Sequence, residues 1–311
     1  MFRVKPFSGA PQTPMSTVAK PAVASPADTE AQPAFNLAPV VWFVGLLILC
    51  YAPILARLVR QWSDDEDMGH GFFVPIIAGY IAWQKRDELL AGPLKTNYLG
   101  LLIVGFAAAQ AWIGVLGAEL FLSRTAFVEA LVGSVLFLGG MHALKVMAFP
   151  LALLVFMVPI PGVLYNQITF PLQLFASRVA AVVLELIGIP VLREGNVLEL
   201  PSQKLNVVEA CSGIRSLLSL SFLSLVYAWF FDSKPWMRWV LLILTVPIAI
   251  VANAGRVTLT GIMSEKINPE TAQGATHLAS GWVIFMIALV ILVGTHQLIN
   301  RIYGVIRARG N

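Results

Sequence analysis

The sequence predicts an all-α polytopic membrane protein with about eight transmembrane helices, one interfacial helix and a small extracytoplasmic hairpin. Hydrophobic residues make up 58% of the 311-residue chain and charged residues only 12%, roughly half of what a soluble domain carries. The mean hydropathy is +0.78. The apolar residues gather in runs of about 20, the length at which a helix crosses a bilayer.

The two ends of the chain differ from this apolar body. Residues 1–37 are rich in Ala, Pro, Ser and Thr and contain no apolar run, so we expect a disordered tail rather than a cleavable signal peptide. The basic residues of this tail favour a cytoplasmic location. The transmembrane domain is expected over residues 38–303, and residues 304–311 are expected to form a short basic cytoplasmic tail.

Eight apolar runs are long enough, or nearly long enough, to cross the membrane. The second is short and contains Pro75 and Gly79, and a short loop that holds Lys145 is expected to separate the fourth from the fifth. The expected spans are residues 38–60, 71–84, 98–117, 120–140, 146–163, 212–231, 238–259 and 278–299.

The segment between the fifth and sixth spans is more polar than the rest. In residues 165–190, Gln167, Gln173, Arg178 and Glu185 interrupt the apolar pattern. Since polar side chains are costly in contact with lipid, this pattern indicates a helix at the interface or inside the bundle rather than a lipid-facing span.

Two short stretches with alternating apolar and polar residues follow, at 196–200 and 204–208. The bend Pro201-Ser202-Gln203 separates them, so this region is expected to form the extracytoplasmic hairpin. The sequence contains no internal repeat and no stretch that predicts a second, soluble domain.

The basic residues of the short loops indicate the orientation. With the N-terminus in the cytoplasm and the 165–190 helix not crossing, the loops richest in Lys and Arg all lie on the cytoplasmic side, as the positive-inside rule requires. These loops are residues 85–95, 145, 234–238 and 301–309. Arg57 and Arg60, at the outer end of the first span, are exceptions.

This orientation brings three reactive side chains to the outer face. Cys211 immediately precedes the sixth span, Arg256 lies at the outer end of the seventh, and His277 lies at the start of the eighth. A helix N-terminus and a nearby cation each lower a thiol pKa and so favour the nucleophilic thiolate. A histidine supplies general acid–base catalysis, and an arginine supplies fixed positive charge for an oxyanion. Sortase-type transpeptidases use these same three residue types.

Each of the three also has a purely structural explanation. A cysteine in a membrane helix is commonly a small packing residue, and His277 could merely cap an interfacial helix. Arg256 could snorkel or pair with Glu209 or Glu265, although an arginine inside a membrane is costly and often functional. Their shared depth favours the catalytic interpretation.

Three further residues are candidates for supporting roles. Arg215 follows Cys211 by four positions and would share its helix face, and Asn253 lies three positions before Arg256. His70, between two glycines on the outer side, is either a substrate contact or an ordinary interfacial histidine.

Other chemistries are not indicated by the sequence. Cys50 lies within the first span, where inert packing is expected. No Cys/His cluster has metal-ligand spacing, so neither a metal nor another cofactor is expected. No basic patch interleaved with aromatic residues indicates a nucleic-acid partner.

Three motifs resemble those of the exosortase/archaeosortase family. They are Glu209-Ala-Cys-Ser-Gly-Ile-Arg-Ser-Leu217, Asn253-Ala-Gly-Arg-Val257 and Thr276-His-Leu-Ala-Ser-Gly-Trp282. Residues 69–75 and 188–196 also resemble segments of bacterial exosortases, so the likeness runs from about residue 60 to residue 285. The resemblance implies a short form, without the extra C-terminal domain of some members, and points to the B-type subgroup.

The resemblance implies a membrane-embedded cysteine transpeptidase or protease of Gram-negative bacteria. Cys211 would be its nucleophile, Arg256 its oxyanion stabiliser and His277 its general acid/base. The implied partners are membrane lipid and secreted proteins that end in a Pro-Glu-Pro motif, an apolar helix and a basic tail (the PEP-CTERM signal). The active site would face the periplasm from the inner membrane, and such proteins are associated with exopolysaccharide production.

In the implied mechanism, Arg193, Lys204 and Arg215 are candidates to hold the glutamate of the motif, and Glu209 is a candidate supporting residue. The alternative is a non-enzymatic membrane component of exopolysaccharide assembly or export, and a third class is a scaffold that retains secreted proteins by helix packing. Polar groups at the bilayer midplane would favour transport, whereas their predicted position at one outer surface favours an enzyme.

Overall fold

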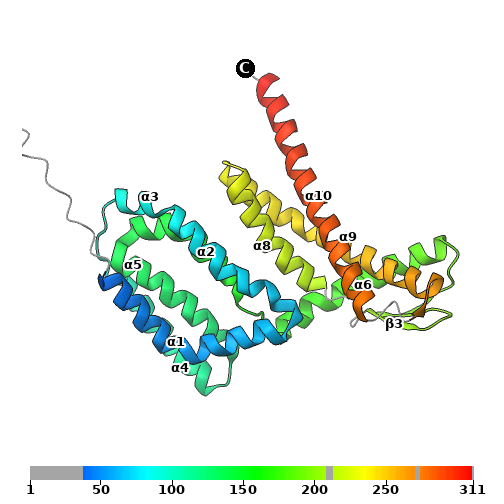
Figure 1. Ribbon diagram of the computed structural model, residues 1–311, viewed down its shortest axis with the longest axis horizontal. Coiled ribbons are helices and arrows are strands. Elements are labelled where there is room, and N and C mark those ends of the chain that lie inside the picture. Colours follow the sequence, from blue (N-terminus) through cyan, green and yellow to red (C-terminus); the bar gives the residue numbers. More distant parts are fainter. Residues whose placement is uncertain (1–37, 208–212, 270–273, 310–311) are drawn as a thin grey trace, which may run out of the picture. The chain divides into compact units, whose positions relative to one another are not determined.

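The computed structural model describes residues 38–207, 213–269 and 274–309, which are mostly helical and include one small antiparallel sheet (Figure 1). This confirms the predicted all-α class. The helices are α1 (Ala38–Asp64), η2 (Glu66–Phe72), α2 (Phe73–Gln84), α3 (Arg86–Ala91), α4 (Leu99–Leu116), α5 (Leu120–Leu153), η3 (Leu154–Met157), α6 (Gly162–Leu186), α8 (Gly213–Phe231), α9 (Pro235–Lys266) and α10 (Gly274–Arg309).

Within the described part of the chain, six helices are long and apolar enough to cross a membrane. They are α1, α4, α5 together with η3, α6, α9 and α10. The protein is therefore a multi-pass membrane protein, but the expected number of eight spans is not confirmed. Two expected spans are not among these six: α2 has only 12 residues, whereas α8 has 19 and coincides with the expected span 212–231. The length and composition of α6 suit a crossing, so its interfacial position stays a prediction.

The expected fourth and fifth spans are the two halves of α5, two helices that meet at a sharp bend at Gly140. Its backbone there has φ +70° and ψ −164°, in a region that glycine adopts without a steric penalty. Leu131 and Leu153 contribute to the same hydrophobic cluster, although a straight helix would separate them by about 33 Å. The two halves therefore fold back on each other. The loop predicted around Lys145 was wrong, because the reversal needs one glycine and no loop.

Helices α4 and α5 pack with their backbones in close contact. A Cβ atom added at Gly133 would lie 2.8 Å from the carbonyl oxygen of Gly100, and one added at Gly114 would lie 2.8 Å from the backbone nitrogen of Ser123. Small residues at such crossings let membrane helices approach closely, and this gives dispersion contacts that lipid cannot replace. This pair, together with α1 and α2, forms the first half of the bundle.

The predicted hairpin is present and has an additional strand. The strands are β1 (Leu192–Glu194), β2 (Val197–Glu199) and β3 (Lys204–Asn206), in the order β1-β2-β3 with both pairs antiparallel. Gly195, at φ +63°, makes the tight turn between β1 and β2. Leu198 and Leu205 point inward and pack with Ala180 of α6 and Val257 of α9. The sheet thereby fixes the connection between α6 and α8.

The second half of the bundle is held together by a buried polar cluster at the turn between α8 and α9. The carboxylate of Asp232 accepts hydrogen bonds from His296 Nε2 (2.9 Å) and Asn300 Nδ2 (2.9 Å) of α10, and Lys234 lies beside it. Burial raises the pKa of Asp232, but these hydrogen bonds and the Lys234 charge together lower it to about 2. The Tyr227 hydroxyl and His296 Nδ1 are 2.9 Å apart. This end of α10 is therefore tied to α8 and α9.

Candidate active site

A cavity of about 600 Å³ lies among η2, α2, α8, α9 and α10. Its polar lining residues are His70, Arg215, Ser216, Ser219 and Arg256. Its apolar lining residues are Phe73, Ile77, Phe222, Leu223, Trp282 and Phe285. The described lining residues include two arginines and no carboxylate, so the cavity favours a ligand that carries negative charge at one end and apolar groups at the other.

The structure brings together three of the residues singled out in the sequence. His70 comes from η2, Arg215 from the first turn of α8, and Arg256 from α9, and all three line this cavity. Arg256 is only 8% exposed. Their elements are far apart in the sequence, so the cavity depends on the tertiary packing of the whole domain.

Two of the proposed catalytic groups fall partly or wholly outside the described structure. Cys211 lies outside the described residues, two positions before Gly213, where α8 begins. Chain geometry alone limits the separation of these two Cα atoms to about 7.6 Å. The backbone of His277 lies in the first turn of α10, one turn before the lining residue Gly281, while its side chain is outside the described part.

Other candidates lie elsewhere. Glu209 is outside the described residues. Asn253 is buried at a small separate cavity that Leu172 and Leu217 also line, so it does not share the main cavity with Arg256.

The two basic residues of the small sheet have local partners and do not line the cavity. Arg193 Nη1 donates to the Gly195 carbonyl (2.8 Å), and Lys204 pairs with Glu199. Glu265 accepts a hydrogen bond from the Ser202 backbone (3.2 Å).

Asp67 holds Arg215, and Tyr165 holds Asp67; neither of these two residues was identified as a partner from the sequence. Arg215 Nε donates to Asp67 Oδ1 at 2.7 Å, and the Tyr165 hydroxyl donates to Asp67 Oδ2 at 2.6 Å. Both distances are typical of strong, charge-assisted hydrogen bonds. The carboxylate thereby connects η2, α6 and α8, and fixes the direction of the guanidinium. The acidic run 64–67 next to His70 was the available signal in the sequence.

Replacing Asp67 by asparagine is expected to destabilise the domain by about 1–3 kcal/mol, because it weakens the charge-assisted bonds of Arg215 and Tyr165. Tyr165→Phe removes one of these bonds and should have the smaller effect. Thermal unfolding in detergent micelles measures both. Asp64→Asn is the matched control, since Asp64 is exposed, and an equal loss of stability in that variant would contradict the role of Asp67.

Hydrogen bonds fix the ring of His70, which lines the cavity. One ring nitrogen, Nε2, is 3.1 Å from the Phe156 carbonyl oxygen, which only accepts, so Nε2 carries the proton. Burial lowers the pKa of His70, which favours the neutral ring near pH 7. Its other ring nitrogen, Nδ1, lies 3.5 Å from the Ser219 hydroxyl. The cavity thus combines two fixed cations with a neutral imidazole.

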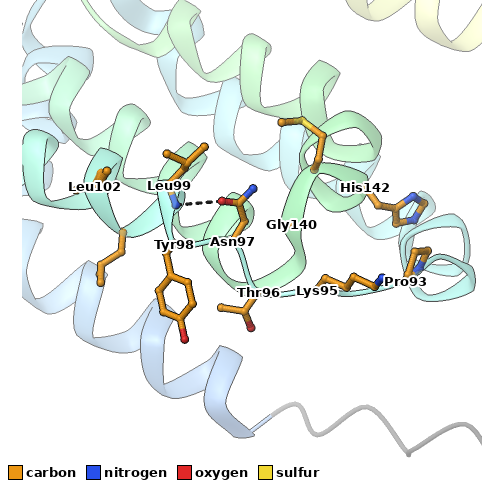
Figure 2. Close-up of a pocket in the computed structure, with 11 residues that line it drawn as sticks. Pro93, Lys95, Thr96, Asn97, Tyr98, Leu99, Leu102, Gly140 and His142 are labelled. Atoms are coloured by element: carbon orange, nitrogen blue, oxygen red, sulfur yellow. Dashed lines mark hydrogen bonds between the residues drawn. The ribbon is translucent and has the colours of Figure 1, made fainter.

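A second cavity, of about 780 Å³, lies at the start of α4, next to the bend of α5 (Figure 2). The Asn97 side chain accepts from the Leu99 backbone at 3.0 Å and caps the start of α4, and His142 Nε2 lies 3.2 Å from the Glu88 carbonyl oxygen. Its lining includes Lys95 but none of the residues proposed for catalysis. In the predicted topology it lies on the cytoplasmic side. Among the described residues, no group of three or more His, Cys, Asp and Glu side chains could hold a metal ion.

The comparisons with known proteins agree with this geometry. Residues 62–294 match the family described as Transmembrane exosortase (Exosortase_EpsH). The matched region includes η2, the start of α8, Arg256 and the start of α10, which are the parts of the chain around the cavity. Searches of curated proteins and of solved structures found no match. Since the match covers well over half of the chain, the protein belongs to the transmembrane exosortase family.

Proposed function

We propose that this exosortase is a cysteine transpeptidase or protease that cleaves C-terminal sorting signals of secreted proteins at the outer face of the bacterial inner membrane. The observation that supports this is the cavity lined by Arg215 and Arg256. Cys211 lies two residues before α8, whose first turn lines this cavity, and His277 lies one turn before Gly281 of its wall.

The proposed reaction begins with attack of the Cys211 thiolate on the scissile carbonyl carbon. Arg256 stabilises the oxyanion that forms, and its low exposure strengthens this interaction because little water screens the charge. His277 donates a proton to the leaving amine as the C–N bond breaks and a thioester forms. An acceptor (water, an amine, or a lipid or glycan nucleophile) then attacks the thioester, gives its proton to His277 and releases the thiolate.

The apolar part of the cavity suits the apolar helix of a sorting signal. Helix α8 forms its floor with Phe222 and Leu223, and its two walls carry Phe73 of α2 and Phe285 of α10. At its far end α10 is tied to the α8–α9 turn through Asp232, which holds this wall in place. We propose that the substrate helix lies along this groove, with the glutamate of its Pro-Glu-Pro motif at Arg215.

A transport role would need polar groups along the bilayer that are available to a cargo. The buried hydroxyl groups in the middle of α8 and α9 already have partners. Ser221 lies 3.3 Å from the Thr245 hydroxyl, Ser224 donates to the Ser221 carbonyl at 2.8 Å, and Thr245 donates to its own helix backbone. This favours the enzyme over the export component.

A single-thiol chain tests the proposal. The protein has two cysteines, so Cys50→Ala leaves only Cys211. This variant should process a secreted reporter that ends in a Pro-Glu-Pro motif, an apolar helix and a basic tail, and thiol alkylation should stop the processing, as seen by the size and membrane attachment of the reporter on blots. Undiminished processing after complete alkylation would contradict a cysteine mechanism. A reporter that is never shortened, even by the unmodified chain, would contradict the proposed substrate.

A further inference from the structure

The guanidinium of Arg256 packs directly against the backbone of α10 at Gly281. A Cβ atom added at Gly281 would lie 2.9 Å from Nη2, 3.0 Å from Cζ and 3.3 Å from Nε of Arg256. Real Cβ atoms essentially never lie as close to a neighbour as the Nη2 distance, and the other two distances are shorter than most real contacts. A side chain at this position would therefore require the guanidinium to shift. Both residues line the cavity of the candidate active site.

The backbone conformation does not explain this glycine. Gly281 lies inside α10 with a helical conformation, and it is not among the described residues with positive φ. Glycine is a poorer helix former than alanine and lowers local helix stability. A glycine inside a helix is therefore expected where there is no space for a side chain. Two other glycines of α10, Gly294 and Gly304, have open space where a Cβ would be. Close packing against Arg256 therefore distinguishes Gly281.

We propose that Gly281 is a positioning residue, whose missing side chain sets how far the Arg256 guanidinium reaches into the cavity. Three atoms of the guanidinium lie near one point of the α10 backbone, so the group is placed by its contact with α10 as well as by its own helix, α9. A shift of about 1 Å at a catalytic group costs about 100-fold in rate. The inference rests on the proposed function, in which Arg256 stabilises the oxyanion.

Gly281→Ala is the direct test, with Gly294→Ala and Gly304→Ala as matched controls on the same helix. We expect reporter processing to fall at least tenfold in Gly281→Ala and to change less than twofold in the controls. The thermal midpoint should stay the same or rise in the two controls, since alanine favours the helix. In Gly281→Ala this gain should offset the cost of moving the guanidinium, so that the midpoint does not fall. Wild-type processing by Gly281→Ala would overturn the inference, and so would a loss of processing that a lower thermal midpoint accompanies.

A double-mutant cycle separates positioning from any other effect of the added methyl group. If Gly281 acts through Arg256, then Gly281→Ala should cause no further loss in an Arg256→Gln background. The same fold loss in both backgrounds would overturn the inference.

The failure of this inference differs from the failure of the proposed function. An inactive Cys211→Ala variant together with a fully active Gly281→Ala variant would overturn only the role of Gly281. A fully active Cys211→Ala variant would overturn the proposed function. The packing would then be tested by modifying Arg256 with phenylglyoxal and following the reaction by mass spectrometry. The modification should be faster in Gly281→Ala than in the unmodified protein. Equal rates would overturn the inference.

Discussion

Replacing Cys211 by alanine is expected to lower reporter processing by about 10⁴-fold or more, to the background of cells that lack the protein. Without the thiol no thioester forms, and the remaining groups can only assist direct attack on an unactivated amide. Cys211→Ser should be nearly as inactive, because a hydroxyl is far less acidic than a thiol and no low-pKa nucleophile remains. Blotting for reporter size in membranes, normalised to the level of the exosortase, measures the loss.

Cys50 provides the matched control for this experiment. It lies on an exposed side of α1, contrary to the expected packing role, and it does not line the cavity. Cys50→Ala should therefore process the reporter within twofold of the unmodified protein. If Cys211→Ala processed the reporter at the rate of Cys50→Ala, covalent catalysis by Cys211 would be excluded. This result would also leave the export component as the better explanation of the protein's function.

The class of the fold could be predicted because hydropathy over windows of about 20 residues is a strong and local signal. The number of spans could not, since it depends on how helices join. At Gly140 the chain reverses between the two halves of α5, which are the expected fourth and fifth spans, and they join directly without a polar loop. Helix α2 has only 12 residues, so its apolar composition predicts burial as well as crossing. Periodicity alone does not distinguish these cases.

The small sheet shows a similar limit. The alternation in residues 196–200 and 204–208 predicted β2 and β3, which pair in that register. Strand β1 consists of one apolar residue followed by two charged ones, so it shows no alternation of its own, and it forms because Gly195 turns the chain back onto β2. Its existence depends on the neighbour to which it bonds.

For the site, the types of residue involved could be singled out from the sequence, but their hydrogen-bond partners could not. Arg215, Arg256 and His70 were singled out as cationic or titratable groups at one level, and the structure places all three at one cavity. Asp67 and Tyr165 are 98 positions apart, and only tertiary packing makes them neighbours. Arg193 has the expected charge, yet it donates a hydrogen bond to the backbone of its own turn and does not line the cavity.

Replacing Arg256 by glutamine is expected to lower kcat by about 10²–10³-fold with little change in KM, the size of effect seen when one oxyanion donor is removed. The oxyanion exists only in the transition state, so an interaction with it lowers the barrier without strengthening substrate binding. Arg256→Lys keeps the charge but loses the planar fork of donors, and we expect an intermediate loss. Initial rates of reporter-peptide cleavage in detergent micelles, measured over a range of peptide concentrations, separate kcat from KM.

Arg193→Gln is the control that distinguishes the cavity from the outer surface in general. Both arginines were candidates on charge and depth, but Arg193 donates to the Gly195 carbonyl and lies outside the cavity, so its replacement should change kcat and KM less than threefold. A raised KM with unchanged kcat in Arg256→Gln would assign Arg256 to the substrate glutamate and leave the oxyanion to Arg215. Equal losses in both variants would mean that outer-face charge attracts the substrate through long-range electrostatics. That effect would weaken at high ionic strength, whereas the loss caused by a missing oxyanion donor inside the cavity would persist.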